Sequence, residues 1–142
     1  MRFWDSSAIV PLVCSEPESS RCRAWLRADP VIVVWAFTIP EVMSALCRKR
    51  REDRLTQRTF AVAKTRLHKI EQAWNEVVSY DAVRARARRL LETHPLSAAD
   101  VLQLAAALVM TEERRQELSL SLLTRDSQRR PLKKGSSCFQ VE

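Results

Sequence analysis

The run VIVVWAF, residues 31–37, contains no polar residue, and its first four residues are β-branched. β-branched residues favour strands, and a strand that is apolar on both faces is typical of a parallel sheet covered by helices on both sides. The run therefore predicts a buried strand that is covered on both faces.

Around this run, strand-like and helix-like patterns alternate. Further strands are predicted at Arg2–Trp4, Glu76–Ser79, Leu118–Leu123 and Cys138–Val141. Helical periodicity covers residues 6–14, 17–28, 39–52, 56–74, 81–93 and 98–117. Alternation of this kind predicts an α/β fold with a parallel sheet and helices on both faces. Pro11 is expected to kink the first helix.

The length and composition fit one domain spanning residues 1–142. An apolar content of 46% is enough for a single core at this size. The longest apolar stretch, residues 101–110, is about half as long as a membrane crossing requires, so no membrane span is predicted. The N-terminus lacks the pattern of a secretory signal, and we expect a cytoplasmic protein with reduced cysteines.

Positive charge gathers in three clusters. The chain has 24 Lys and Arg against 17 Asp and Glu, a net charge of +7. The clusters are CRKRR at 47–51, RARARR at 84–89 and RRPLKK at 129–134. They fit a polyanionic partner such as nucleic acid, and they fit equally well the solvated faces of helices. The single glycine, Gly135, excludes the glycine-rich loops that bind nucleotide phosphates.

Four acids follow predicted strands or open a predicted helix. They are Asp5, Glu41, Asp100 and Asp126. Ligands of open α/β sheets bind beyond the carboxyl ends of the strands, so these acids are candidates for a functional site.

Each acid also has a purely structural explanation. Asp5 is placed to cap the first helix, and Asp126 fits a turn. Glu41 stands three residues after Thr38, and Asp100 stands three residues after Ser97, which are the spacings of capping boxes.

Taken together, the four acids suggest a metal site. Two carboxylates about 4 Å apart repel by about 4 kcal/mol at an effective dielectric constant near 20, so a cluster needs a cation. Oxygen ligands without Cys or His at zinc spacing favour Mg²⁺ or Mn²⁺. His68 lies in a basic helical pattern and His94 precedes a proline, and both are expected to have surface or capping roles.

Four motifs, in this order, resemble those of PIN-domain ribonucleases, and more narrowly VapC-type toxins of toxin–antitoxin pairs. They are FWDSSAIVPL (3–12), IPEVMSAL (39–46), LSAADVLQLAAAL (96–108) and LLTRDSQ (122–128). The resemblance implies a three-layer α/β/α fold with a mainly parallel sheet of four to five strands. It also implies a Mg²⁺- or Mn²⁺-dependent endoribonuclease that cuts structured RNA, is silenced by a cognate antitoxin and forms a homodimer.

By motif position, the resemblance assigns the catalytic, metal-binding quartet to Asp5, Glu41, Asp100 and Asp126. The hydroxyls of Ser7 and Thr124 match small polar positions that support the acids in that family. We expect Asp5 and Asp100 to hold the principal ion, Glu41 to position or deprotonate the attacking water, and Asp126 to complete a second, weaker site. An arginine beside the last acid is a departure from the family pattern.

Two other functions compete with this interpretation. One is a catalytically silent PIN-like module that binds nucleic acid or a protein, with the acids serving as caps. The other is a receiver-type or phosphatase domain, which needs paired acids such as D-D or D-x-D, whereas this chain has D-S-S.

Surplus apolar helical surface is a further expectation. It is predicted to form a groove for an antitoxin segment and a homodimer contact. The residues are Trp25, Leu26, Phe60, Val62, Leu67, Ile70 and Trp74.

Overall fold

Strand β2 (Ile32–Trp35) lies at the centre of the parallel sheet, and all four of its residues are buried. It pairs in parallel with β1 (Arg2–Phe3) on one side and with β3 (Asn75–Val77) on the other. The computed structural model describes residues 1–113, 120–122 and 139–141. The predicted buried strand is therefore confirmed, and the structure places it in the middle of the parallel sheet.

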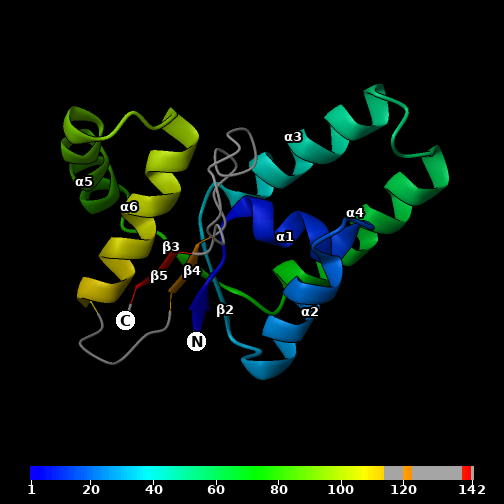
Figure 1. Ribbon diagram of the computed structural model, residues 1–142, viewed down its shortest axis with the longest axis horizontal. Helices are drawn as coiled ribbons and strands as arrows, with labels where there is room; N and C mark the ends of the chain where they lie inside the picture. The colour runs from blue at the N-terminus through cyan, green and yellow to red at the C-terminus, as the bar shows by residue number, and fades with distance from the viewer. Residues whose placement is uncertain (114–119, 123–138, 142) are drawn as a thin grey trace.

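Helices cover both faces of this sheet (Figure 1). They are α1 (Ser6–Val13), α2 (Ser19–Ala28), α3 (Thr38–Arg51), α4 (Gln57–Glu71), α5 (Tyr80–Thr93) and α6 (Ala98–Glu113). Because successive side chains of a strand point to opposite faces, Ile32 and Val34 join the core formed with α1 to α4. Val33 and Trp35 join the core formed with α5 and α6. The predicted three-layer α/β/α arrangement is confirmed.

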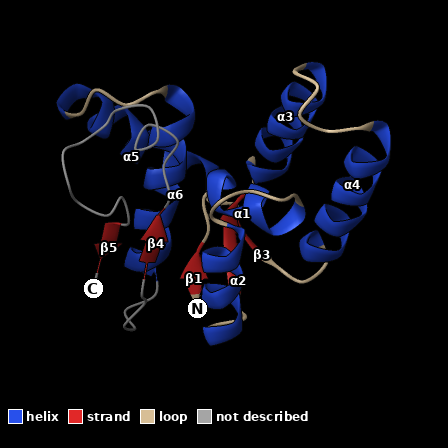
Figure 2. Ribbon diagram, turned by 45° about the vertical axis from the view of Figure 1, so that its right-hand side comes forward, coloured by secondary structure: helices blue, strands red, loops and turns tan. Residues whose placement is uncertain are grey.

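Two further strands form a separate, antiparallel ladder. They are β4 (Leu120–Leu122) and β5 (Phe139–Val141). β4 lies beside β1, so the second ladder adjoins the edge of the parallel sheet (Figure 2). The five strands expected from the sequence are present, three in the parallel ladder and two in the antiparallel one.

Helix α1 tolerates its internal proline. Pro11 lies inside the helix, which continues to Val13. The hydroxyl of Ser19 donates to the Pro11 carbonyl oxygen at 2.7 Å, tying the start of α2 to the end of α1. Helix α1, whose N-terminus lies directly beyond the carboxyl end of β1, is thus fixed to α2 at its other end.

The prediction of a surplus apolar surface is wrong for some of its residues. Phe60 and Leu67 of α4 are buried, at 6% and 3% exposure, in the core shared with α1 and α3. Four more of the predicted residues are partly buried against the same core: Trp25, Leu26, Ile70 and Trp74. Of the seven, only Val62 is exposed, at 43%. The reason is that α4 packs against α1 and α3, which covers the apolar face of the helix.

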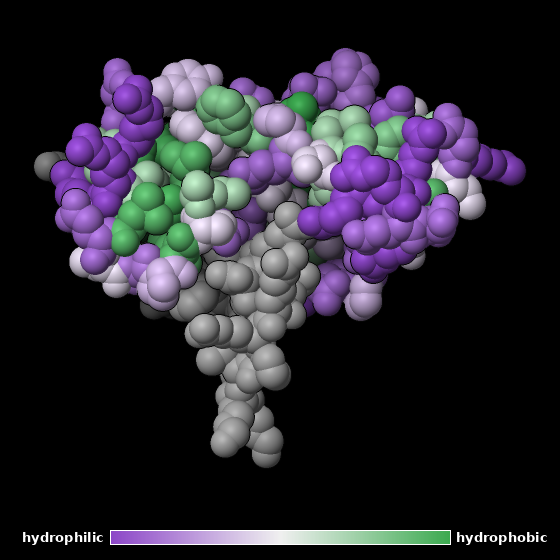
Figure 3. Space-filling model, turned by 90° about the horizontal axis from the view of Figure 1, so that it is seen from above, coloured by the Kyte–Doolittle hydropathy of each residue, from purple (hydrophilic) through white to green (hydrophobic). Residues whose placement is uncertain are grey.

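Hydrophilic residues gather at the two ends of the molecule when it is viewed from above, with hydrophobic patches between them (Figure 3). None of the helices in the described part of the chain is long and apolar enough to cross a membrane.

Leu46→Ala tests whether the α3 side of the core stabilises the fold. Leu46 is fully buried, so its truncation should lower the free energy of unfolding by about 2 to 5 kcal/mol. Leu91→Ala on α5 is the control, because Leu91 is 47% exposed and its truncation should cost about 0.5 kcal/mol. Urea unfolding of both variants measures the difference. Equal losses would contradict the core described above.

Candidate active site

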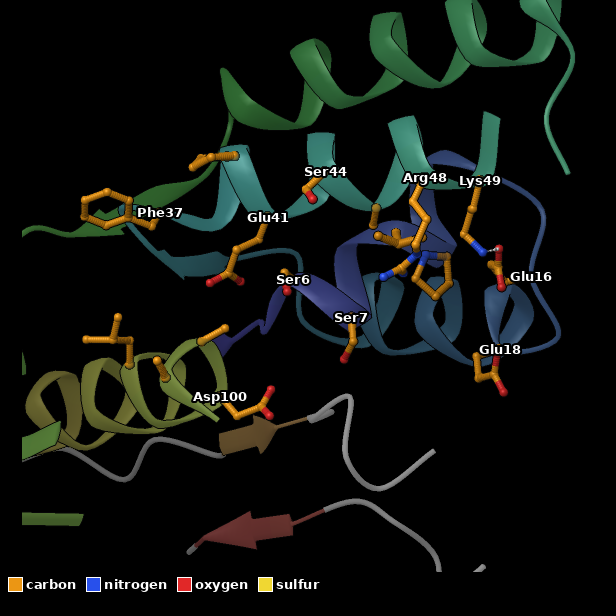
Figure 4. Close-up of a pocket in the computed structure, with 17 residues that line it drawn as sticks. Ser6, Ser7, Glu16, Glu18, Phe37, Glu41, Ser44, Arg48, Lys49 and Asp100 are labelled. Carbon is orange, nitrogen blue, oxygen red and sulfur yellow. Dashed lines mark ion pairs between the residues drawn. The ribbon is translucent and has the colours of Figure 1, made fainter. Parts of the chain in front are cut away.

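A cavity of about 520 Å³ lies between α1, α3 and the first turn of α6, beyond the carboxyl ends of β1 and β2 (Figure 4). One part of its wall carries the acids Glu41 and Asp100 with the hydroxyls of Ser6 and Ser7. The opposite part carries the charged residues Glu16, Glu18, Arg48 and Lys49.

Asp5 lies behind the serine wall of the cavity. It is the N-cap of α1 and is 3% exposed. Its carboxylate accepts hydrogen bonds from the Ser7 backbone N–H at 3.3 Å and from the Ser7 hydroxyl at 2.9 Å. The Ser6 hydroxyl donates to it at 3.1 Å. Burial nevertheless raises the pKa of Asp5 to about 6, with a further contribution from the negative charge of Glu41.

Glu41 does not serve as part of a capping box. Helix α3 begins at Thr38 with Phe37 as its N-cap, and no side chain caps it. The Glu41 carboxylate instead accepts a hydrogen bond of 2.5 Å from the Gln103 amide. Burial raises the pKa of Glu41, while hydrogen bonds from Gln103 and Ser6 lower it and the charge of Asp100 raises it.

Asp100 is partly exposed in the first turn of α6. Its backbone N–H donates to the Ser97 hydroxyl oxygen at 3.2 Å, and that hydroxyl donates back to the Asp100 carboxylate at 2.7 Å. A capping interaction is therefore present, as its structural explanation predicts. The carboxylate nevertheless lines the cavity, where Figure 4 shows it across from Glu41.

The three acids form a chain of like charges without a counterion. Glu41 acts electrostatically on Asp5, and Asp100 acts on Glu41. Within the described residues, every ion pair of a Lys, an Arg or the N-terminus involves other acids. The same residues contain no group of three His, Cys, Asp or Glu side chains placed to hold a metal ion. The acids thus share one region without forming a finished metal site.

At the opposite end of the cavity, Lys49 is already held in an ion pair within the protein. Lys49 is 8% exposed and pairs with Glu16 at 2.5 Å. Burial, helped by the charge of Glu16, raises the pKa of the Cys14 thiol to about 11, so Cys14 is not a nucleophile. Arg48 also lines the cavity and makes a weak contact of 3.9 Å with Glu52.

The structure brings together Asp5, Glu41, Asp100 and Ser7 of the six predicted site residues. Asp126 and Thr124 lie outside the described residues. Neither histidine forms a hydrogen bond with Asp5, Glu41 or Asp100. His68 contacts Glu71, and His94 contacts Thr93.

Sequence reasoning missed two residues of the site. Ser6 hydrogen-bonds both Asp5 and Glu41, and Gln103 hydrogen-bonds Glu41 while its own Oε1 atom has no partner in the described part of the chain. Gln103 stands one helical turn after Asp100, on the same face of an apolar helix, and this spacing is the signal that identifies it.

The profile of the PIN domain matches residues 2–133 of the chain. The chain belongs to the PIN-domain family. No curated protein matches this PIN domain in sequence. Its fold is similar to that of VapC20 from Mycobacterium tuberculosis, a toxin that cleaves the sarcin–ricin loop, with a TM-score of 0.55 and 18% identity over 80% of this chain and 83% of that one. The family resemblance expected from the sequence is confirmed.

Asp5→Asn tests the electrostatic cost of the acid cluster. Because the pKa of Asp5 is raised from 3.8 to about 6, the folded state binds the extra proton, and stability should fall as pH rises from about 4 to about 6. The loss amounts to about 3 kcal/mol, and asparagine keeps the cap while removing the charge. Urea unfolding in EDTA should show the variant gaining stability over wild type at pH 7.5, and much less at pH 4. A gap independent of pH would contradict the shift.

Proposed function

We propose that this PIN domain is a metal-dependent endoribonuclease of the VapC toxin type that hydrolyses structured RNA. The observation that carries the proposal is the grouping of three acids: Glu41 and Asp100 line one cavity, and Asp5 lies buried directly behind its serine wall. Within the described residues, no Lys or Arg forms an ion pair with any of the three. In a family of nucleases, such a group is better explained by chemistry than by helix capping alone.

The side chains fit Mg²⁺ or Mn²⁺. All nearby donors are oxygens, from three carboxylates and the hydroxyls of Ser6 and Ser7, and such a set favours a hard divalent cation. Burial is the main reason that the pKa values of Asp5 and Glu41 are raised, with a smaller contribution from neighbouring acids, and a bound cation would offset the cost of keeping these carboxylates charged. Asp5 and Asp100 would hold the principal ion, and Asp126 would contribute to a weaker second site.

The acids divide the catalytic work according to their surroundings. When bound, the ion supplies positive charge against the developing charge on the phosphate and makes a nearby water more acidic. Glu41 orients the attacking water and accepts its proton, and burial, which raises its pKa, makes the carboxylate a stronger base for that task. Gln103 and Ser6 hold the Glu41 carboxylate in place, and Ser7 holds that of Asp5.

Positive residues around the site would bind the RNA backbone. Arg48 lines the cavity itself, and the clusters at 47–51 and 84–89 lie on α3 and α5, toward opposite ends of the molecule (Figure 1). A structured RNA is proposed because VapC20, which shares the fold, cleaves the sarcin–ricin loop. A cognate antitoxin that silences the enzyme, a homodimer and a cytoplasmic location are part of the same proposal, and they rest on the resemblance of the sequence motifs to VapC-type toxins.

A catalytically silent PIN-like module is the second candidate. The hydrogen bond between Ser97 and Asp100 favours it, because it gives Asp100 a capping role that needs no metal. Metal binding separates the two candidates, since a silent module with capping acids has no reason to respond to Mn²⁺.

Purified protein should cleave a stem–loop RNA in the presence of Mg²⁺ or Mn²⁺. Addition of EDTA should stop the reaction, because the proposed mechanism needs a bound cation to offset charge on the phosphate and to make the attacking water more acidic. Cleavage products are resolved on a denaturing gel. Cleavage that continues in EDTA would rule out the metal mechanism.

Asp100→Asn separates a ligand from a cap. The change keeps the shape of the side chain and removes its charge, so loss of a cap alone should cost at most about 1 kcal/mol and leave cleavage intact. If Asp100 is a ligand, cleavage should fall by orders of magnitude. Mn²⁺ should then raise the melting temperature of wild type much more than that of the variant.

Asp81→Asn is the matched control for this experiment. Asp81 also lies in the first turn of a helix, and its side chain is 98% exposed and does not line the cavity. The control should keep wild-type cleavage and the Mn²⁺ response. An Asp100→Asn variant that behaves in the same way would leave Asp100 as a cap only.

A further inference from the structure

Two aromatic side chains beside the cavity are left half-exposed. Phe37, directly after β2, is 51% exposed, and Tyr80, at the start of α5, is 48% exposed. Phe37 is also part of the cavity wall. Neighbouring aromatic rings with this much exposed surface are typical of binding sites.

The rings of Phe37 and Tyr80 both pack against the ring of Trp35. The centroid of the buried Trp35 ring lies 5.6 Å from that of Phe37 and 5.5 Å from that of Tyr80. Phe37 and Tyr80 meet edge to face, with centroids 6.2 Å apart and planes at 81°. These are favourable geometries for aromatic pairs, so the orientation of Phe37 is set before any ligand arrives.

Phe37 stands next to the proposed catalytic acids. As the N-cap of α3, its carbonyl oxygen accepts the Glu41 backbone N–H at 3.3 Å, so the two residues are one helical turn apart. One turn is about 5.4 Å along the axis. Figure 4 shows Phe37 and Glu41 toward one end of the cavity and Arg48 and Lys49 toward the other. Along the cavity, the order is therefore aromatic ring, acids, and then Arg48 beside the Lys49–Glu16 ion pair.

We propose that Phe37, supported by Trp35 and Tyr80, is a stacking platform for an unpaired nucleobase of the RNA, in the nucleotide at or directly beside the cleaved phosphate. The inference rests on the proposed ribonuclease function and names the part of the substrate that this surface binds. A nucleotide joins a flat, neutral ring to an anionic phosphate. Its base matches the aromatic ring at one end of the cavity, and Arg48, beyond the acids, matches the negative charge of the RNA backbone. A basic peptide would meet the positive charge of Arg48 instead.

Stacking of this kind has a consequence for specificity. Every base has a flat face, so an aromatic platform selects an unpaired base without selecting its identity. Paired bases in a duplex are not available to it. The platform therefore favours cleavage in loops of structured RNA, over cleavage within stems.

The test compares wild type, Phe37→Leu and Phe37→Tyr. Leucine keeps apolar bulk without the ring, and tyrosine keeps the ring. The probe is a stem–loop RNA with 2-aminopurine at one loop position at a time, whose fluorescence falls when the base stacks. Binding is measured in EDTA, and again in Mn²⁺ with each change in the Asp100→Asn background. Light scattering and melting curves of each variant check the number of subunits and the fold.

Wild type and Phe37→Tyr should quench the probe at one or two adjacent loop positions. Phe37→Leu should abolish that quenching and weaken RNA binding roughly 5- to 100-fold, the range measured for loss of one base–aromatic stack. Equal binding and quenching by Phe37→Leu would overturn the proposal. So would a change in the number of subunits in Phe37→Leu, which would make the surface a contact between copies. Ring-dependent quenching by a wild-type protein that does not cleave RNA would support the platform while refuting the nuclease.

Discussion

Strand β2 must bury Ile32 and Val34 on one side of the sheet and Val33 and Trp35 on the other. A strand with no polar face is stable only between two layers of helices, so this requirement sets the three-layer architecture. It also positions the site. The chain leaves the carboxyl end of β2 into α3, which carries Phe37 and Glu41 to the same edge where β1 delivers Asp5.

The acids at that edge are an unfavourable arrangement for the protein alone. Asp5 is nearly fully buried, and the hydrogen bonds from Ser6 and Ser7 only partly offset the cost of burying its charge. Glu41 relies on a buried glutamine from α6 whose own oxygen atom lacks a partner in the described part of the chain. Conflict of this type, on an otherwise well-packed scaffold, is expected where function and not stability has selected the residues.

The type of side chain that lines the cavity changes from one end to the other. The cavity passes from an aromatic ring through carboxylates to an end that carries Arg48 beside the Lys49–Glu16 ion pair. Membership of the PIN-domain family explains the fold. The aromatic ring and Arg48 line the same cavity as Glu41 and Asp100.

Much of the fold was accessible from the sequence because it depends on local signals. The apolar run at 31–37, the alternation of periods and the S-x-x-D spacing identify β2, the order of elements and the Ser97–Asp100 cap without knowledge of contacts. The candidate acids were accessible for the same reason, since strand ends can be located along the chain. The family motifs supplied their grouping.

Tertiary packing decided what local patterns leave open. Thr38 and Glu41 have the spacing of a capping box, but Gln103 from α6 binds both side chains, a contact across 65 and 62 residues. Phe60 and Leu67 match an exposed apolar stripe, but helix-on-helix packing buries them. The sequence alone determined which side of each helix or strand is apolar and which is charged, because periodicity is a local property. Only the tertiary structure decided which residues pack against each apolar side or bind each charged group, because that depends on which distant elements meet.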